Sequence, residues 1–283
     1  MNFRQMLGFI LLLTLSLLAV SGVQAAIVGH LTQVEGQVEL MRQGKLPFLL
    51  AKVKDGVEPG DVIRTKSASR AQISFIDGSS LTIAPGSRVG LEDFSFDSQK
   101  GHRQAVLQIF QGLVRCVVPR LFQVEKPDFI MKTQTATLGV RGTSWYTLIG
   151  INFTQAFAEK GMIQVSSLPG AVPGTVLLAA WEHTLVKKGL APIAPRLFTP
   201  EILHQLQNWL INGVPPGVVS GGLAQTLWLQ REKGGMPHFP QRPAQVQGSL
   251  YIPPVVPPQP LHPQSPGGAS SSGGSTGGHI KGH

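Results

Sequence analysis

Hydrophobic and polar residues alternate in short runs from residue 27 to about residue 167, and Gly, Asp or Pro residues separate the runs. The clearest example is the pair of runs 71–76 and 80–84, which flank Asp77 and Gly78. An Asp-Gly pair between two alternating runs is typical of a β-hairpin, because both residues tolerate a positive φ. Since no helical period interrupts the series, the pattern predicts an all-β domain.

The alternation continues beyond this hairpin and extends the prediction to a whole domain. Further runs occupy residues 105–110, 113–118, 129–133, 144–149 and 161–165. We therefore expect a mainly β chain, with a compact domain of short antiparallel strands arranged as a sandwich, a roll or a solenoid-like stack. No repeat of fixed period marks the sequence as a long solenoid.

A helical pattern begins at residue 199. Thr199 is suited to cap a helix, Pro200 to occupy its first position, and Glu201 to complement the helix dipole. Asn212-Gly213 ends the pattern. Between these signals, apolar residues fall on one helical face, namely Ile202, Leu203, Leu206, Trp209 and Leu210.

A second, weaker helix is expected over residues 221–233, with Ser220 as its cap. Its two leading glycines weaken the prediction, since each costs about 1 kcal/mol relative to alanine. The two helices carry Trp209 and Trp228. We expect their apolar faces to pack on each other or on the β domain. The alternative is that the two tryptophans mark an exposed docking surface.

Changes in composition divide the chain into four parts. They are a signal peptide at residues 1–25, a β domain at residues 26–190, a helical segment at residues 191–236 and a tail at residues 237–283. The tail is first Pro-rich and then Gly- and Ser-rich. Such a composition favours polyproline II and flexible coil and cannot bury a core of its own, so we expect a disordered tail.

Residues 1–25 are typical of a secretory signal peptide. Arg4 supplies the positive start, residues 6–20 form an apolar run, and Val23-Gln24-Ala25 provides small residues at a cleavage site. No cysteine stands directly after the apolar run, at the position where a lipid would be attached, which argues against a lipid anchor. We expect an exported protein that is periplasmic or secreted, in which the apolar run is either cleaved or retained as an anchor.

The chain is basic, with a net charge of +9 from 24 Lys and Arg against 15 Asp and Glu. This balance favours anionic surroundings such as lipid headgroups or acidic polysaccharide. The basic residues are scattered, however, with no charge run and no basic helix. We therefore expect a solvated basic surface and no nucleic-acid partner, and association with a membrane only if residues 1–25 are retained.

The single cysteine, Cys116, excludes an intramolecular disulfide. It shares one face of its expected strand with Val114 and Val118. This position predicts a buried, inert thiol, with a reactive or intermolecular cysteine as the alternative.

The sequence lacks the motifs that mark common enzymes. It contains no His-Glu-x-x-His metal motif, no Gly-x-Ser-x-Gly elbow, no Ser-x-x-Lys pair and no phosphate-binding glycine loop. Glu92, Asp93 and Asp97 lie close together, but on a stretch that we interpret as a solvated turn rather than a catalytic pair. The eight histidines stand singly. We therefore expect a protein that is not an enzyme and has no metal site and no cofactor.

Several landmarks, in order, make residues 53–166 resemble the FecR domain of bacterial envelope proteins. They are residues 60–65, 71–83, 107–118, 129–133, 140–146 and 159–165. One of them is Val140-Arg141-Gly142-Thr143-Ser144-Trp145-Tyr146, which follows Gly139, and the order and spacing of all of them carry the resemblance. The resemblance implies an all-β module that works through contacts with other molecules.

FecR proteins of the best-known type hold a sigma factor with a cytoplasmic segment and receive a signal from an outer-membrane receptor in the periplasm. The present chain has a signal peptide where that cytoplasmic segment would be. We therefore expect an interaction module that binds an envelope protein or a surface polymer. The alternative is a periplasmic signalling component that relays a receptor signal to a separate membrane regulator.

The signature turns carry the candidate site residues. They are Asp77, Gly78, Gly139, Arg141, Gly142 and Thr143. We interpret them first as structural, because glycine permits backbone conformations that other residues resist. A sharper hypothesis gives Arg141 a role in binding an anionic partner, since a guanidinium forms strong charge-assisted hydrogen bonds.

Overall fold

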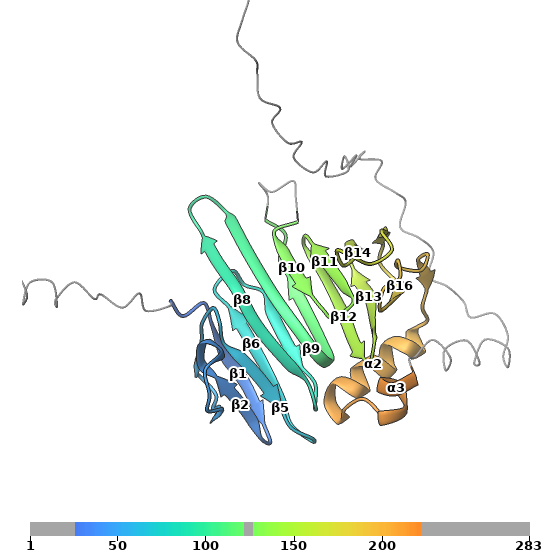
Figure 1. Ribbon diagram of the computed structural model, residues 1–283. Coiled ribbons are helices and arrows are strands. Elements are labelled where there is room, and N and C mark those ends of the chain that lie inside the picture. The colour runs from blue at the N-terminus through green and yellow to red at the C-terminus, as the bar shows by residue number, and fades with distance from the viewer. Residues whose placement is uncertain (1–25, 122–126, 222–283) are drawn as a thin grey trace, which may run out of the picture. The chain divides into compact units, whose positions relative to one another are not determined.

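The computed structural model describes residues 26–121 and 127–221 (Figure 1). The expected signal peptide, most of the expected second helix and the whole tail lie outside these described residues. Within them the chain is mainly β, as the alternation predicted, and the helices follow the last strand.

Two sheets of nine strands form the described β structure and share one strand, β9 (His102–Val118). The first sheet has the order β4-β1-β6-β7-β9-β12-β13-β16-β17, and all its pairs are antiparallel. Its other strands are β1 (Gly29–Glu35), β4 (Gly56–Val57), β6 (Arg70–Phe75), β7 (Ser80–Ile83), β12 (Thr143–Gly150), β13 (Phe153–Lys160), β16 (Glu182–Lys187) and β17 (Arg196–Leu197).

The second sheet has the order β3-β2-β5-β8-β9-β10-β11-β14-β15. Its pairs are antiparallel except for β9 and β10, which are parallel. Besides β9 it contains β2 (Val38–Met41), β3 (Leu49–Leu50), β5 (Val62–Thr65), β8 (Arg88–Asp97), β10 (Phe129–Lys132), β11 (Ala136–Val140), β14 (Ile163–Ser167) and β15 (Thr175–Leu178). A short 3-10 turn, η1 (Arg42–Gly44), follows β2.

Strand β9 is one strand of 17 residues rather than the two short strands that the sequence pattern predicted. Residues up to Gln111 pair in the second sheet, and residues from Gly112 onward pair in the first. Gly112 has φ +97°, and a Cβ on it would lie 2.1 Å from Ser87 Oγ. Only glycine fits this point, because the φ and the contact both exclude a side chain. In Figure 1, β9 lies between the earlier strands (blue to cyan) and the later ones (green to yellow).

A single hydrophobic core fills the space between the two sheets. The alternating positions of β9 contribute Ala105, Leu107 and Ile109 to it, each at most 1% exposed. Trp145 from the first sheet meets Phe129 from the second edge to face, with 5.9 Å between ring centroids. Because each strand buries the residues on its inward face, the period of two in the sequence is the period of this core.

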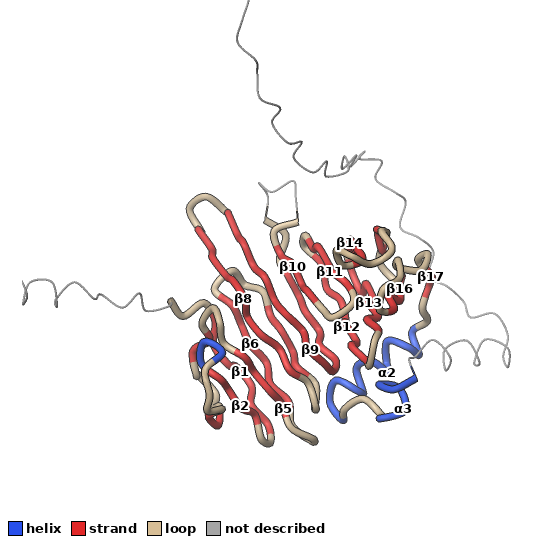
Figure 2. The backbone as a smooth tube through the Cα atoms, viewed as in Figure 1, coloured by secondary structure: helices blue, strands red, loops and turns tan. Residues whose placement is uncertain are grey.

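A second core covers the outer face of the first sheet. Helix α2 (Pro200–Asn212) buries Leu206 and Trp209 against Tyr146 and Phe157, and the short helix α3 (Pro216–Gly221) lies beside β12. Figure 2 shows both helices in blue next to these strands. Strands β12 and β13 are therefore buried on both faces.

The predicted helix at residues 200–212 is confirmed, and its face packs on the β domain. Trp209 is 5% exposed and belongs to the core. Thr199 precedes the helix with an extended backbone, but its side chain forms no capping hydrogen bond. Gly213 ends the helix with φ 92°. Helix α3 begins before the expected second helix, of which residues 222–233 lie outside the described residues.

His183 of β16 is held in this second core. Its ring stacks on Phe157 at 5.4 Å, and its Nδ1 is 3.2 Å from Gln155 Nε2. Burial, with a smaller contribution from the positive charge of Arg196, lowers the pKa of His183 from 6.5 to about 4. The native protein thus keeps a neutral imidazole at a pH where an unfolded chain would protonate it.

We predict that His183 makes the protein less stable as the pH falls from 6.5 toward 4. In this window His183 binds a proton in the unfolded state but not in the native state, so the free energy of unfolding rises with pH. Between pH 7 and pH 4.5, His183 should account for about 2 kcal/mol of lost stability. Urea unfolding of the wild type and His183→Phe at both pH values measures the difference. Equal losses in the two proteins would contradict the prediction.

Candidate functional site

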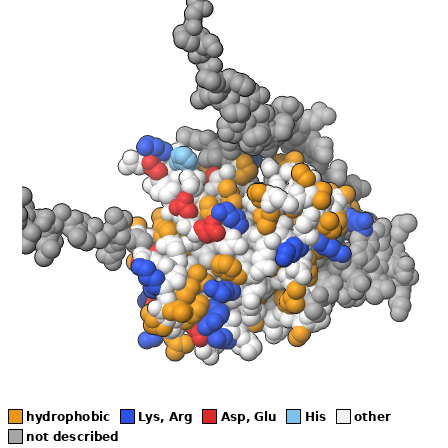
Figure 3. All heavy atoms as spheres, viewed as in Figure 1, with side chains coloured by type: hydrophobic (Ala, Val, Ile, Leu, Met, Phe, Trp, Pro, Cys, Tyr) orange, Lys and Arg blue, Asp and Glu red, His pale blue; other side chains and the backbone are white. Residues whose placement is uncertain are grey.

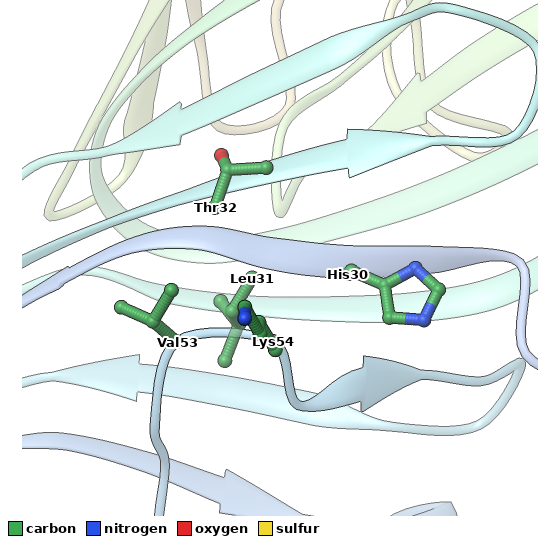
Figure 4. A pocket seen from close by; sticks show the side chains of 5 residues that line it. All are labelled: His30, Leu31, Thr32, Val53 and Lys54. Carbon is green, nitrogen blue, oxygen red and sulfur yellow. The ribbon is translucent and has the colours of Figure 1, made fainter.

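A hollow on the described surface, beside β1, is a candidate binding cavity. Its volume is about 280 Å³, and His30, Leu31, Thr32, Val53 and Lys54 line it. In Figure 4 the ring of His30 and the side chain of Val53 lie at opposite ends of the hollow and do not converge. No group of three or more His, Cys, Asp or Glu side chains within the described residues could hold a metal ion. The hollow has no arrangement that points to catalysis.

The structure brings the predicted turns together at the end of β9. The Asp77-Gly78 turn connects β6 to β7, and the Gly142 turn connects β11 to β12. A Cβ on Gly78 would lie 3.7 Å from Pro119 Cγ, and a Cβ on Gly142 would lie 2.5 Å from Arg120 Cβ. Both turns therefore flank the chain where it leaves β9.

A buried arginine, Arg103, connects this end of the molecule. Its Nη1 donates to Asp77 Oδ2 at 2.8 Å, and its Nη2 donates to Asp128 Oδ1 at 2.8 Å. Nη2 also approaches Pro119 O at 3.4 Å. Arg103 is 1% exposed, so two carboxylates and a carbonyl replace water at its two terminal nitrogens, while its Nε has no hydrogen-bond partner among the described residues. The three side chains tie β9 to the β6–β7 turn and to the start of β10.

Asp77 also shapes its own turn. Its Oδ1 accepts a hydrogen bond from Ser79 N at 2.9 Å, while its Oδ2 accepts from Arg103. Gly78 follows with φ +81°. The Asp-Gly pair therefore forms the hairpin turn that it indicated. Asp77 is in addition one of the two acids that pair with the buried Arg103.

Sequence reasoning missed Arg103, although the pattern contained a signal for it. Arg103 stands two residues before Ala105, on the phase of β9 that buries Leu107 and Ile109. A charged residue on the apolar phase of a strand must find a partner inside the protein, because burying an unpaired charge is costly. The position predicts a buried ion pair, but it does not name the acids.

The remaining signature residues have different environments. Gly139 lies within β11 and has no positive φ; its lack of a side chain leaves room for Pro127, whose Cβ would be 3.1 Å from a Cβ on Gly139. Gly142 has φ +62° and forms the turn itself. Thr143 Oγ1 donates to Met162 O at 2.9 Å and so joins this turn to the next one. Arg141 is half-buried beside them.

The interpretation of Glu92, Asp93 and Asp97 as a solvated turn was wrong. They belong to β8, which continues to Asp97 because β9 pairs with it along this length. Glu92 forms an ion pair with Lys132, and Asp93 accepts from Gln104. The register shifts between Leu91 and Asp93, and the irregular spacing hid the strand from a strict period of two.

Cys116 is completely buried in the core between the sheets, as predicted. Burial raises the pKa of its thiol well above the ordinary value, with the charge of Asp77 acting in the same direction. A neutral thiol without access to solvent is a poor nucleophile. Cys116 therefore serves packing.

Among the described strands, β15 pairs only with β14, so its other edge, here called the open edge of the second sheet, offers hydrogen-bonding groups to other molecules. Ser167 N donates to Gly174 O, directly opposite, at 3.0 Å. Hydrogen-bonded and non-hydrogen-bonded pairs alternate along antiparallel strands, so the backbone groups of Val176 face β14 and those of Thr175 and Leu177 face outward. The side chain of Leu177 is 53% exposed. This edge is four residues long, whereas β3, β4 and β17 have two each.

A comparison with protein families agrees with the resemblance seen in the sequence. Residues 61–172 match the model of a family described as FecR protein. Two solved structures of a "putative anti-sigma factor" from Parabacteroides distasonis are also similar, at 17% sequence identity. One has a TM-score of 0.41 and aligns over 53% of this chain and 63% of its own; the other has a TM-score of 0.40 and aligns over 52% and 64%.

This chain therefore spans less than two thirds of the length of those two structures. A comparison with curated proteins gives no match. Among the described residues, no helix combines the length and the apolar character needed to cross a bilayer.

We predict that Arg103→Met destabilises the protein by about 3–5 kcal/mol, because it leaves the carboxylates of Asp77 and Asp128 buried without their counter-charge. The triple variant Arg103→Met, Asp77→Asn, Asp128→Asn also removes the two unpaired carboxylate charges and should recover part of the lost stability. Chemical denaturation measures all three proteins.

A matched control is Arg64→Met. Arg64 pairs with Glu39, and their side chains are 35% and 12% exposed. Lys66 also lies 3.6 Å from Glu39 and would still balance its charge, so the loss of Arg64 should cost about 1 kcal/mol. Equal losses of stability for Arg64→Met and Arg103→Met would contradict the prediction that the buried ion pair contributes more to stability than the more exposed one.

Proposed function

Because residues 61–172 match the FecR family, we propose that the protein is a non-catalytic interaction module of the bacterial cell envelope. Residues 1–25 direct its export. The module acts by binding an envelope protein at the open edge of its second sheet, and this binding transfers a signal where the partner is a receptor or a membrane regulator. The FecR domain supports the regulatory part of this proposal, and the geometry of β15 supports the mode of binding.

The observation that carries the proposal is the outward-facing backbone of β15. An extended segment of another protein can add to such an edge as a further strand, with main-chain hydrogen bonds to Thr175 and Leu177. Exposed edges are usually protected by charged residues or proline. Thr175–Leu178 contains neither, and the half-exposed Leu177 offers an apolar contact to the incoming strand.

Two partners fit this proposal, and both are proteins of the envelope. The first is a structural or assembly partner of the kind that an interaction module binds. The second, favoured by the FecR domain, is a receptor or membrane regulator in a signalling relay.

We predict that Leu177→Pro abolishes partner capture and leaves the fold intact. Proline removes the outward N–H of residue 177, and proline is tolerated on an edge strand where the lost N–H forms no bond within the sheet. A photo-crosslinking amino acid at Thr175 should capture one defined protein in intact cells. In the Leu177→Pro background it should capture at least about tenfold less of that protein. Mass spectrometry identifies the captured protein.

The control places the same photo-crosslinker at Ile151, which is 63% exposed and lies outside β15. It should not capture that protein. Thermal unfolding of Leu177→Pro should match the wild type within a few degrees. Undiminished capture by the folded Leu177→Pro variant, or equal capture from Ile151, would reject strand addition at β15.

A further inference from the structure

Residues 42–54 form an exposed loop, here called the cationic loop, that combines apolar and basic side chains. Its sequence is Arg-Gln-Gly-Lys-Leu-Pro-Phe-Leu-Leu-Ala-Lys-Val-Lys, with four basic residues and no acid. It includes β3, an edge strand of the second sheet, and it precedes the residues that match the FecR family. Figure 3 shows orange and blue side chains intermingled at the end of the molecule that holds β1, β2 and β5.

Four apolar residues of the cationic loop face solvent. The exposed fractions are 77% for Leu46, 54% for Leu49, 68% for Leu50 and 49% for Val53. Ile27, 49% exposed, lies nearby against Gly56. Single exposed apolar residues are normal, but several of them within one short loop mark an interaction site.

The loop is held in this conformation by contacts at its base. Arg42 Nη1 donates to Asp61 Oδ2 and to Gly56 O, both at 2.8 Å. Ala51 is buried, and its N–H donates to Val38 O at 2.9 Å. Lys54 N donates to Leu31 O at 2.8 Å. The exposed leucines are therefore presented by an ordered loop, so binding would cost little additional ordering.

The basic residues of the loop identify the chemistry of the partner. Lys45, Lys52 and Lys54 are exposed and form no ion pair with any described residue. Asp55, the nearest acid in the sequence, accepts a hydrogen bond from the backbone N–H of Lys52. A surface with unpaired lysines around protruding leucines complements anionic headgroups above an apolar interior.

From this arrangement we propose that the cationic loop binds the surface of a bilayer that contains anionic phospholipids. Leu46, Leu49 and Leu50 enter the boundary between headgroups and acyl chains. Lys45, Lys52 and Lys54 lie over the lipid phosphates, since long basic side chains keep their charge in the polar layer. This attachment is independent of residues 1–25 and does not rest on strand addition at β15.

The test uses an environment-sensitive fluorophore attached at Leu50→Cys in the full exported chain. Cys116 stays unlabelled because it is fully buried. Vesicles of phosphatidylethanolamine and phosphatidylglycerol should shift the emission to the blue, whereas vesicles of phosphatidylcholine should not. The same fluorophore at Ile151→Cys, a site of similar exposure, should show no shift with either.

Variants separate the two parts of the surface. Lys45→Gln, Lys52→Gln, Lys54→Gln should weaken binding to the anionic vesicles about a hundredfold, because each lysine near an anionic surface contributes about fivefold. Leu46→Ser, Leu49→Ser should weaken it about tenfold or more. The control variant Lys160→Gln, Lys187→Gln, Lys188→Gln changes the same net charge at other exposed sites and should change binding by less than about threefold.

Four results would overturn the proposal. They are no shift at position 50, an equal shift with phosphatidylcholine, an equal shift at position 151, and equal weakening by the two lysine triples. A shift without vesicles that grows with protein concentration would assign the surface to a second copy of the chain. A shift that requires an acidic protein from the envelope fraction would assign it to that protein.

Discussion

The structure depends on one strand that belongs to both sheets. Because β9 passes from the second sheet to the first at Gly112, neither sheet can form completely without it. Ser87 fixes this crossing, since its Oγ accepts from Leu113 N at 3.1 Å and fills the space that a side chain at residue 112 would need. The two ends of β9 also meet through Arg103, which lies at its start and contacts Asp77 and the carbonyl of Pro119 beyond its end. The core, the ion pair and the signature turns are thus consequences of how one strand is placed.

Much of the fold could be predicted because the signals were local. The Asp77-Gly78 hairpin follows from two residues that accept positive φ, and α2 follows from its first turn and a helical apolar face. The length of β8 and β9 was not predictable in the same way. Gly112 interrupts the alternation as a turn would, and the register shift near Leu91 changes its phase. The parallel pairing of β9 with β10 is a non-local choice that no short motif records.

The candidate site shows the same division. Sequence reasoning found Asp77 and the glycines, because turns leave a signature, but it assigned Gly139 to a turn when it lies in β11 under Pro127. The partner of Asp77 was invisible, since Arg103 and Asp128 are distant in the sequence and only the folded chain brings them together. The groups that we propose to bind partners are backbone atoms at an edge and leucines on a loop. They lie at opposite edges of the second sheet, β15 and β3, with β9 in the middle of the strand order, so a rigid β9 would hold the two surfaces at a fixed separation.

Hydrogen exchange along β9 tests most directly whether this strand makes the two sheets one cooperative unit. We expect the amides on both sides of Gly112 to exchange with the same opening free energy, equal to the global free energy of unfolding measured by denaturant, because neither half can open alone. Exchange of residues 113–118 at a different free energy from residues 103–111 would contradict the account, since the two sheets would then open independently.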